Sequence, residues 1–189
     1  MKENNYLNYN FSEKNSFASV SIGVFFVDIK LIYAGFRDRL VNLISNEKFE
    51  KVITNISHIL IEKGYNKELY LSILLTDNNY IKQINKKFRK KTSPTNIISF
   101  PSDDFNYHKF TNNKQQGISL HFGDIIISLE KILSESKEQN KNFKNHFYHI
   151  LLHGLLHLLG YDHNDEESAN NMENLEISIL NSIGIDNPY

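Results

Sequence analysis

Cysteine and tryptophan are both absent from this sequence of 189 residues. Without cysteine the chain can form neither disulfide bonds nor thiolate metal sites, and such a composition is typical of a reducing compartment. Neither sign of charge is in excess, because 21 basic and 22 acidic residues leave a net charge of −1. Any contact with a nucleic acid must therefore come from a local basic patch rather than from the overall charge of the protein.

Long hydrophobic runs are also missing. The strongest early apolar segment, residues 20–29, is interrupted by Ser21, Gly23 and Asp28 and is far shorter than the ~20 apolar residues that span a bilayer. The first residues lack the basic segment and apolar run of a signal peptide. We therefore expect a cytoplasmic protein with no membrane partner.

The residues that are present are sufficient for one folded domain. Thirteen phenylalanines and ten tyrosines provide bulky core material, and 40% of the chain is hydrophobic. Residues 1–18 are rich in Asn, Ser, Lys and Glu, so we expect a flexible N-terminal extension there. No repeat or linker divides residues 19–189, which are predicted to form a single domain.

Hydrophobic periodicity predicts the secondary structure. Four strands are expected, at residues 19–30, 69–76, 95–100 and 123–128. Helices are expected at residues 36–63 (as one or two helices), 78–89 with Asp77 as N-cap, 129–140, 143–159 and 166–182, and a long loop at residues 102–120. Strands and helices mix without strict alternation, which predicts an α+β fold with a small mixed four-stranded sheet covered by helices.

Three histidines, His153, His157 and His163, have the spacing of a metal site. A step of four residues on a helix brings His153 and His157 to one face, one turn apart. Gly160 offers a helix stop, because glycine tolerates the left-handed backbone of a C-terminal cap. The chain can then turn and bring back His163 as a third ligand. Three imidazoles and one open position form a catalytic zinc site, whereas structural zinc sites are usually closed by four ligands.

The residue after the first histidine separates this motif from that of the zinc proteases. In the His-Glu-x-x-His motif this residue is a glutamate that acts as general base, and here it is Gly154. Peptide hydrolysis also needs proton transfer to a poor amine leaving group. The missing glutamate argues against a protease and favours another substrate, although the histidine spacing itself matches.

Other residues near the motif are candidates for supporting roles. Asp162 is a rival third ligand, but His163 is favoured because imidazole suits zinc. His149 lies one turn before His153, and a supporting or packing role suits it better than ligation, which would strain a regular helix.

Two further polar groups come from predicted strands. Asp124 opens a strand, where it can orient a ligand histidine through the second ring nitrogen. Thr95 and Ser99 are an even number of residues apart and share one face of another strand, where they form a supporting polar set.

A basic cluster lies near the end of the helix predicted at residues 78–89. It places five positive charges within six residues: Lys86, Lys87, Arg89, Lys90 and Lys91. Basic residues at a helix C-terminus also complement the helix dipole, so the cluster alone does not establish a binding site. As a phosphate-binding patch it would depend most on Arg89, whose guanidinium can hold two phosphate oxygens in a planar fork.

Together these residues resemble the YbeY family of bacterial endoribonucleases, also called rRNA maturation factors. The family motif His-Gly-x-Leu-His-Leu-x-Gly-Tyr-Asp-His is complete at residues 153–163. Further family blocks follow the family order, at residues 84–91, 94–100 and 123–125, with Met172 and Glu176 as a tail element. The resemblance covers about residues 20 to 185. Departures are Thr92, where many relatives are acidic, the long loop at residues 102–120 and the polar N-terminal extension.

The resemblance implies an α+β fold and one zinc ion per chain held by His153, His157 and His163. It implies a single-strand-specific endoribonuclease that matures the 3′ end of small-subunit ribosomal RNA and acts in ribosome quality control. The implied partners are ribosomal RNA and the small ribosomal subunit, with a ribosomal protein or GTPase as further candidates. It also implies a functional role for Arg89.

The expected mechanism divides the roles between the metal, Arg89 and the lysines. The metal would polarise a phosphoryl oxygen or activate water, and Arg89 would stabilise charge on the phosphoryl group. The segment of residues 86–91 would hold the RNA backbone. Two alternatives remain open: a zinc metallopeptidase-like hydrolase, and a non-catalytic ribosome-associated factor whose metal is structural.

Overall fold

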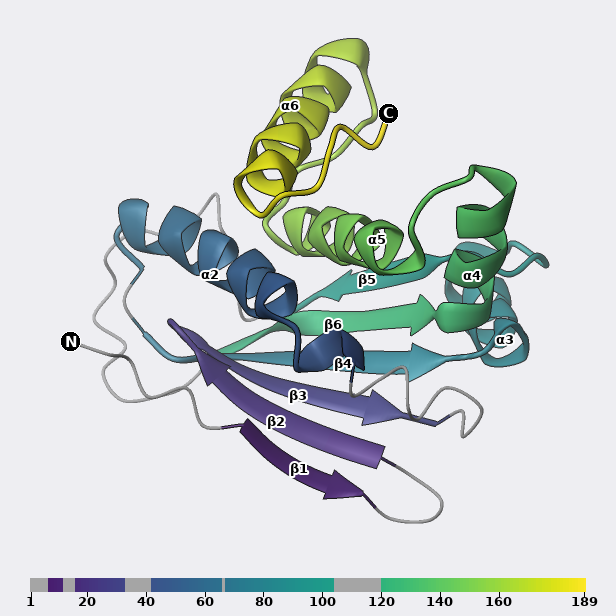
Figure 1. Cartoon of the computed structure of the whole chain (residues 1–189), viewed down its shortest axis with the longest axis horizontal. Coiled ribbons are helices and arrows are strands. Elements are labelled where there is room, and N and C mark those ends of the chain that lie inside the picture. The colour runs from purple at the N-terminus through teal and green to yellow at the C-terminus, as the bar shows by residue number, and fades with distance from the viewer. Residues whose placement is uncertain (1–6, 12–15, 33–41, 66, 104–119) are drawn as a thin grey trace.

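A computed structural model describes residues 7–11, 16–32, 42–65, 67–103 and 120–189 of the chain. The described strands form one six-stranded sheet in the order β1-β2-β3-β4-β6-β5 (Figure 1). These strands are β1 (Leu7–Phe11), β2 (Ser16–Ile22), β3 (Phe25–Leu31), β4 (Leu69–Thr76), β5 (Ile97–Pro101) and β6 (Leu120–Ser128). The helices are α2 (Glu47–Glu62), α3 (Asn78–Arg89), α4 (Leu129–Glu138), α5 (Phe143–Leu158) and α6 (Glu166–Ser182).

The sheet is mixed, with a parallel centre and antiparallel edges. Strands β3, β4 and β6 run parallel, while β1 and β2 at one side and β5 at the other pair antiparallel with their neighbours. Parallel neighbours require a crossover connection, and α2 provides it between β3 and β4. The predicted α+β class is confirmed.

The predicted number of strands was too low, since six strands are described rather than four. The segment at residues 19–30, expected as one strand, contains parts of both β2 and β3, which form a hairpin. Gly23, with φ of 58°, allows the sharp turn between them, and the prediction of a single strand joined the apolar residues on both sides of this turn. Strand β1 and the start of β2 lie within residues 1–18, and the flexible extension expected there stays a prediction.

Most other elements lie where the sequence placed them. Strand β4 and helices α3 and α6 have the predicted bounds, and Asp77 caps α3 by accepting a hydrogen bond from the backbone N–H of Tyr80 at 2.7 Å. Strand β5 begins at Ile97, two residues later than expected, and β6 begins at Leu120, three residues earlier. The parts of the predicted helix and loop at residues 33–41 and 104–119 lie outside the described residues.

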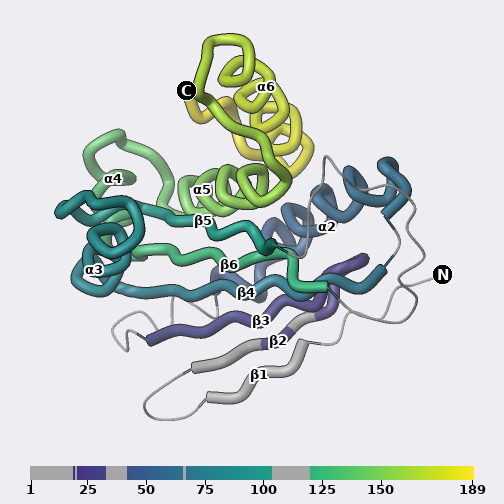
Figure 2. The backbone as a smooth tube through the Cα atoms, turned by 180° about the vertical axis from the view of Figure 1, so that it is seen from behind, coloured from purple at the N-terminus to yellow at the C-terminus, as the bar shows by residue number. Residues whose placement is uncertain are grey.

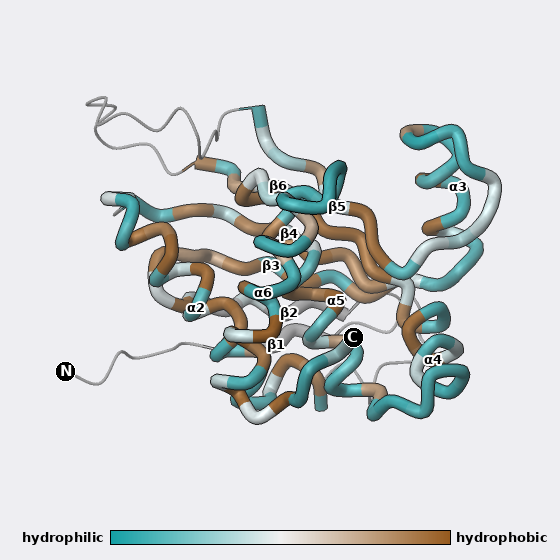
Figure 3. Tube along the Cα trace, turned by 90° about the horizontal axis from the view of Figure 1, so that it is seen from above, coloured by the Kyte–Doolittle hydropathy of each residue, from teal (hydrophilic) through white to brown (hydrophobic). Residues whose placement is uncertain are grey.

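Helix α5 is the centre of the helical layer. It contacts β5 and β6 below it, α2 and α4 beside it, and α6 above it, as the view from behind shows (Figure 2). Its leucines 151, 152, 155 and 156 are fully buried. Figure 3 shows hydrophobic residues concentrated along the central strands and hydrophilic residues along much of α3 and α6. Because α5 is enclosed by the core, its histidines have fixed positions.

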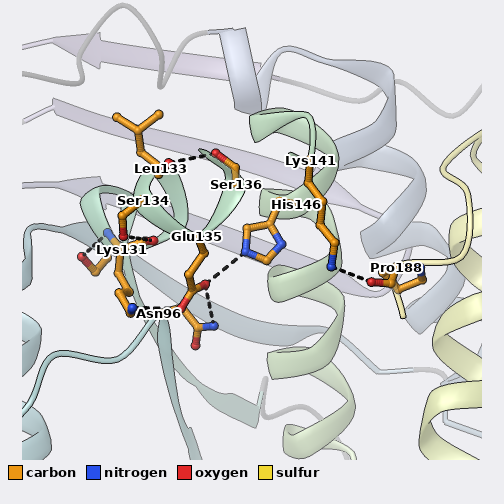
Figure 4. A network of polar contacts seen from close by, with 10 residues as sticks. Asn96, Lys131, Leu133, Ser134, Glu135, Ser136, Lys141, His146 and Pro188 are labelled. Carbon is orange, nitrogen blue, oxygen red and sulfur yellow. Dashed lines mark hydrogen bonds and ion pairs between the residues drawn. The ribbon is translucent and has the colours of Figure 1, made fainter. Parts of the chain in front are cut away.

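A polar network fixes α4 against α5 and against the residue before β5 (Figure 4). The Glu135 carboxylate accepts a hydrogen bond from Asn96 Nδ2 at 3.1 Å and lies 3.1 Å from His146 Nε2. Lys131 adds an ion pair at 3.5 Å. The network positions the segment that leads into β5, and β5 forms one wall of the site described next.

Among the described helices, none is both long and apolar enough to cross a membrane.

Candidate metal centre

Three histidine side chains converge at the C-terminal end of α5. His153 and His157 lie one turn apart on α5, and His163 lies in the segment that leads to α6. One ring nitrogen from each of the three lies within 4.8 Å of the others. The Nε2 atoms of His153 and His157 are 3.0 Å apart. The geometry therefore brings together the three residues that the sequence spacing selected.

The end of α5 explains how His163 returns to the other two. Gly160 has φ of 87°, and its N–H donates to the carbonyl of His157 at 3.0 Å. The N–H of Tyr161 donates to the carbonyl of Leu156, also at 3.0 Å. These two bonds form a Schellman motif, in which a glycine in the left-handed region ends the helix and reverses the chain. The reversal carries His163 back over the last turn of α5.

Hydrogen bonds orient both helical histidines. His153 Nδ1 lies 2.8 Å from Glu176 Oε1, and His157 Nδ1 lies 3.0 Å from the carbonyl oxygen of Tyr161. Because these oxygens only accept, each Nδ1 carries the proton and donates. The Nε2 atoms are then unprotonated and have a lone pair to offer a metal. Histidine ligands in metalloproteins are usually held by such partners.

Glu176 is the functional residue that the site analysis of the sequence did not select. Its side chain is fully buried on α6, where one oxygen lies 2.8 Å from His153 and the other 3.3 Å from His149. The hydroxyl of Tyr189 donates to the same carboxylate. Burial by itself raises the pKa of Glu176, but hydrogen bonds from His149, His153 and Tyr189 outweigh it and lower the pKa to about 2. Glu176 is therefore a buried anion next to the centre.

The protonation state of His157 also suits a ligand. Burial lowers the pKa of His157, and the neighbouring charge of His153 lowers it further, while the hydrogen bond to Tyr161 works in the opposite direction. The net direction is downward, so the imidazole is neutral at neutral pH. A metal ligand must be deprotonated at the coordinating nitrogen, and no proton has to be displaced from His157 on binding.

The three histidines line a pocket of about 720 Å³. Arg89, Thr95 and Ser99 line the same pocket, so the structure brings these predicted site residues to the metal centre. The hydroxyl of Ser99 donates to the carbonyl of Gly154 at 3.0 Å and thereby ties β5 to α5. The predicted RNA-binding lysines 86, 87, 90 and 91 are exposed around Arg89, at the end of α3 and just beyond it.

Gly154 lies in close contact with β5. A Cβ atom at this position would lie 2.3 Å from Ile97 Cδ1 and 3.0 Å from Ser99 Oγ. The glycine thus allows α5 to approach β5 closely, and a larger residue at this position would require the side chains of Ile97 and Ser99 to shift.

Three candidates from the sequence lie away from the centre or have other partners. Asp124 does not orient a helical ligand histidine, because its carboxylate pairs with His121 at 3.3 Å. Glu176, which is distant in the sequence, orients His153 instead. Asp162 accepts hydrogen bonds from Asn164 and is not in the cluster. His149 supports Glu176 from one turn before His153.

The donor set fits a divalent metal ion. Zinc binds imidazole nitrogen at about 2.0 Å in tetrahedral geometry, which places two such nitrogens about 3.3 Å apart. The Nε2 atoms of His153 and His157 are already 3.0 Å apart, and their second nitrogens are held by hydrogen bonds. Three nitrogen donors that face a pocket leave one side open for water or substrate.

Comparison with known proteins identifies the family. The family model named endoribonuclease YbeY matches residues 37–184. The endoribonuclease YbeY of Francisella philomiragia subsp. philomiragia is 45% identical over 132 residues, which cover 69% of this chain and 80% of the relative. That of Francisella tularensis subsp. novicida is 39% identical over 158 residues, 79% of this chain and 91% of the relative.

One solved structure is also among the matches. The solution structure of a Thermotoga maritima protein matches with a TM-score of 0.47 and 20% identity, over 83% of this chain and 91% of that one. The family model covers well over half of the chain, and both Francisella relatives exceed a third identity over most of their length. The chain belongs to the endoribonuclease YbeY family.

Proposed function

We propose that the protein is a metal-dependent endoribonuclease that cuts single-stranded RNA at the three-histidine centre. The observation that carries this proposal is the convergence of His153, His157 and His163 on one point, with their open side facing a pocket that Arg89 also lines. Membership of a family whose members are named endoribonucleases supports the substrate class.

The proposed metal is zinc, one per chain, held by the three histidines. When bound, a divalent cation supplies Lewis acidity, which polarises a phosphoryl oxygen and lowers the pKa of water. Glu176 keeps His153 in the ligand orientation through the 2.8 Å contact at Nδ1, and the carbonyl of Tyr161 does the same for His157. The chain thus holds two ligands in place before any metal arrives.

The protein groups around the centre have separate tasks. Arg89 stabilises the negative charge that develops on the phosphoryl group, which is an electrostatic role worth several kcal/mol at comparable sites, about 3 kcal/mol for one donor. The exposed lysines 86, 87, 90 and 91 attract the RNA backbone. Ser99 and Thr95 shape the pocket wall, with Ser99 engaged to Gly154.

The finer biological role is proposed on the same basis. The substrate is ribosomal RNA, the task is maturation of the small-subunit rRNA 3′ end and ribosome quality control, and the protein acts in the cytoplasm on the small ribosomal subunit. A ribosomal protein or GTPase partner would supply further specificity. We assign the nuclease domain to residues 19–189 and an extension to residues 1–18, which add β1 and the start of β2 to the sheet of the domain.

The test is cleavage of a single-stranded fragment of small-subunit rRNA by purified protein with zinc, beside a His153→Ala variant prepared identically. Cleavage by the parent and none by the variant is the expected result. Equal cleavage by both would mean that the activity comes from a contaminant or from another site. No cleavage by a folded, zinc-loaded parent would contradict the proposal that the protein cuts free single-stranded RNA.

The same preparations separate the other two interpretations of the sequence. A casein digestion assay tests the metallopeptidase, and we expect no digestion because residue 154 is a glycine and supplies no general base. Thermal unfolding of metal-free protein tests the structural metal. The metal-free protein should unfold cooperatively, because α5 is enclosed by the sheet and by α2, α4 and α6 rather than held by the metal alone.

A further inference from the structure

Phe88 has an unusual place for a large apolar side chain. It lies on α3 directly before Arg89, and 54% of its surface is exposed. Its ring packs edge-on against Phe100 of β5, with ring centroids 5.0 Å apart and planes at 72°. The contact holds the ring in place while one part of it stays open to solvent. An exposed aromatic ring that is fixed in this way is a candidate binding platform.

Phe88 and Phe100 connect two hollows on the surface. Both rings line the pocket of about 720 Å³ that contains the histidines. Both also line a second hollow of about 390 Å³ between α3 and the sheet, here called the Phe88 hollow. The two hollows therefore share a wall at β5. An extended ligand with one part at the metal centre can place its next part against Phe88.

The lining of the Phe88 hollow suits a flat molecule with polar edges. Its walls are mostly apolar, with Ile84 from α3 and Leu74 and Ile126 from the sheet. Asp124 and Ser72 add an acceptor and a hydroxyl. A carboxylate accepts hydrogen bonds from the N–H groups of nucleobases, while apolar and aromatic walls take the base faces. Asp124, which does not orient a helical ligand histidine, contributes the carboxylate acceptor of this hollow.

The charges nearby favour a polyanion over an apolar ligand. Lys87 Nζ lies 5.0 Å from the centroid of the Phe88 ring. Lys86, Lys90 and Lys91 are exposed in the same segment, together with Arg89. Aromatic platforms combined with a basic track are how proteins bind single-stranded nucleic acids. The ring and the cations therefore point to the same ligand class.

We propose that the Phe88 hollow binds one unpaired nucleobase of the substrate RNA, stacked on Phe88, beside the nucleotide at the metal centre. This proposal rests on the proposed function for the nature of the ligand. It gives the preference for single-stranded RNA a structural reason at Phe88, because a base paired in a duplex must first be unpaired and unstacked, at a cost of roughly a few kcal/mol, before it can enter the hollow.

Binding of short single-stranded RNAs, measured by fluorescence anisotropy in metal-free buffer, tests the proposal without cleavage. One abasic nucleotide is moved through the RNA, one position at a time. We expect a single position at which loss of the base weakens binding by at least about fivefold in the parent. In Phe88→Ala the intact RNA should bind more weakly by a similar factor, and the abasic penalty should disappear. Phe88→Tyr should keep both.

Two control variants separate stacking from charge and from folding. Phe26→Ala removes another exposed ring, which packs against Tyr70 and lines neither hollow, and it should bind RNA like the parent. Lys91→Ala should weaken binding to every RNA equally and reduce its salt dependence by about one phosphate contact, with the abasic penalty unchanged. Thermal unfolding checks that each variant is folded.

The outcomes are distinct. A flat abasic scan in the parent, or a Phe88→Ala variant that still shows the positional penalty, would overturn the base-binding hollow. An equal loss of affinity in Phe88→Ala for the intact RNA and for every abasic RNA would also overturn it, because the ring would then not hold a base. If the abasic scan shows a Phe88-dependent position but the protein cleaves no RNA, the base-binding hollow is supported and the proposed nuclease function is contradicted.

Discussion

At the scale of single residues, the centre depends on a carboxylate that never touches the metal position. Glu176 lies 2.8 Å from His153 Nδ1 and is fully buried, so it fixes one ligand from behind. His149 and Tyr189 bind the same carboxylate and hold it in turn. Partners of this kind typically change metal affinity by about 10- to 100-fold when they are removed.

Glu176→Gln should therefore weaken zinc binding by about tenfold or more. The amide keeps the size of the side chain but loses the negative charge that favours the donating Nδ1–H of His153. Zinc affinity is measured by competition with a chelator. Glu167→Gln, at an exposed position of the same helix, is the matched control and should bind zinc like the parent. Equal affinities for all three proteins would show that Glu176 does not orient the ligand.

Arg89 should separate metal binding from catalysis. Arg89→Ala should retain zinc, because no ligand is changed, and should lose about 100-fold or more in cleavage rate. Single-turnover cleavage with saturating protein measures the rate, and metal analysis of the same sample measures zinc. Lys82→Ala, on the same exposed helix but outside the pocket, should cleave at the parental rate. Normal cleavage by Arg89→Ala would refute the assigned role.

At the scale of elements, the approach of α5 to β5 builds the pocket. Gly154 allows this approach, since a Cβ there would meet Ile97 Cδ1 at 2.3 Å. Ser99 then binds the Gly154 carbonyl, and β5 becomes the wall opposite the histidines. The pocket in front of the histidines is thus a product of the contact between α5 and β5.

Gly154→Ala should lower the free energy of unfolding by about 1 to 3 kcal/mol, because overpacking forces α5 and β5 apart. Ile97→Val removes the methyl group nearest to the new Cβ. The double variant should therefore be more stable than the sum of the two single changes predicts, by about 0.5 kcal/mol or more. Urea unfolding of the four proteins measures this coupling. If the changes in the free energy of unfolding are strictly additive, the side chain of Ile97 is not the reason why residue 154 is a glycine.

The α4–α5 contact should make stability depend on pH. Burial raises the pKa of Glu135, but hydrogen bonds with His146 and Asn96 and the charge of Lys131 outweigh it, so the pKa lies below its ordinary value of 4.5. A carboxyl with a lowered folded-state pKa contributes stability that is complete above the unfolded-state pKa. This stability is lost as the pH falls through the folded-state pKa.

The stability difference between the parent and Glu135→Gln should therefore shrink as the pH falls from about 5 to about 3. Urea unfolding at several pH values measures the difference, and Figure 4 shows the contacts that the variant changes. A difference that stays constant over this range would contradict the polar contacts of the Glu135 carboxylate with His146 of α5 and with Asn96.

At the scale of the whole molecule, local patterns were predictable and distant contacts were not. The strand bounds of β4 and the cap of α3 follow from an apolar run and from Asp77, which are local signals. The histidine cluster was predictable because its spacing lies within one helix and one turn. Glu176 meets His153 across 23 residues of sequence, and no spacing rule links them. The tail element of the family resemblance was the only sign of it.

The number of strands also could not be predicted from local patterns alone. The apolar residues on both sides of Gly23 were assigned to one strand, and the positive φ of Gly23 together with the pairing of β2 and β3 shows the hairpin. Pairing of β1 with β2 is likewise a contact between strands rather than a property of either one. The neighbours of each strand, and hence the face that carries the Phe88 hollow, are set by the assembled sheet.

A zinc titration of metal-free protein, with RNA cleavage measured at every point, tests the central claim most directly. Cleavage should rise in proportion to zinc up to one equivalent per chain and then stay constant, and His163→Ala should show neither tight binding nor cleavage. Cleavage at full rate by the metal-free protein would contradict the claim. One tightly bound zinc with no cleavage of any single-stranded RNA would contradict it as well.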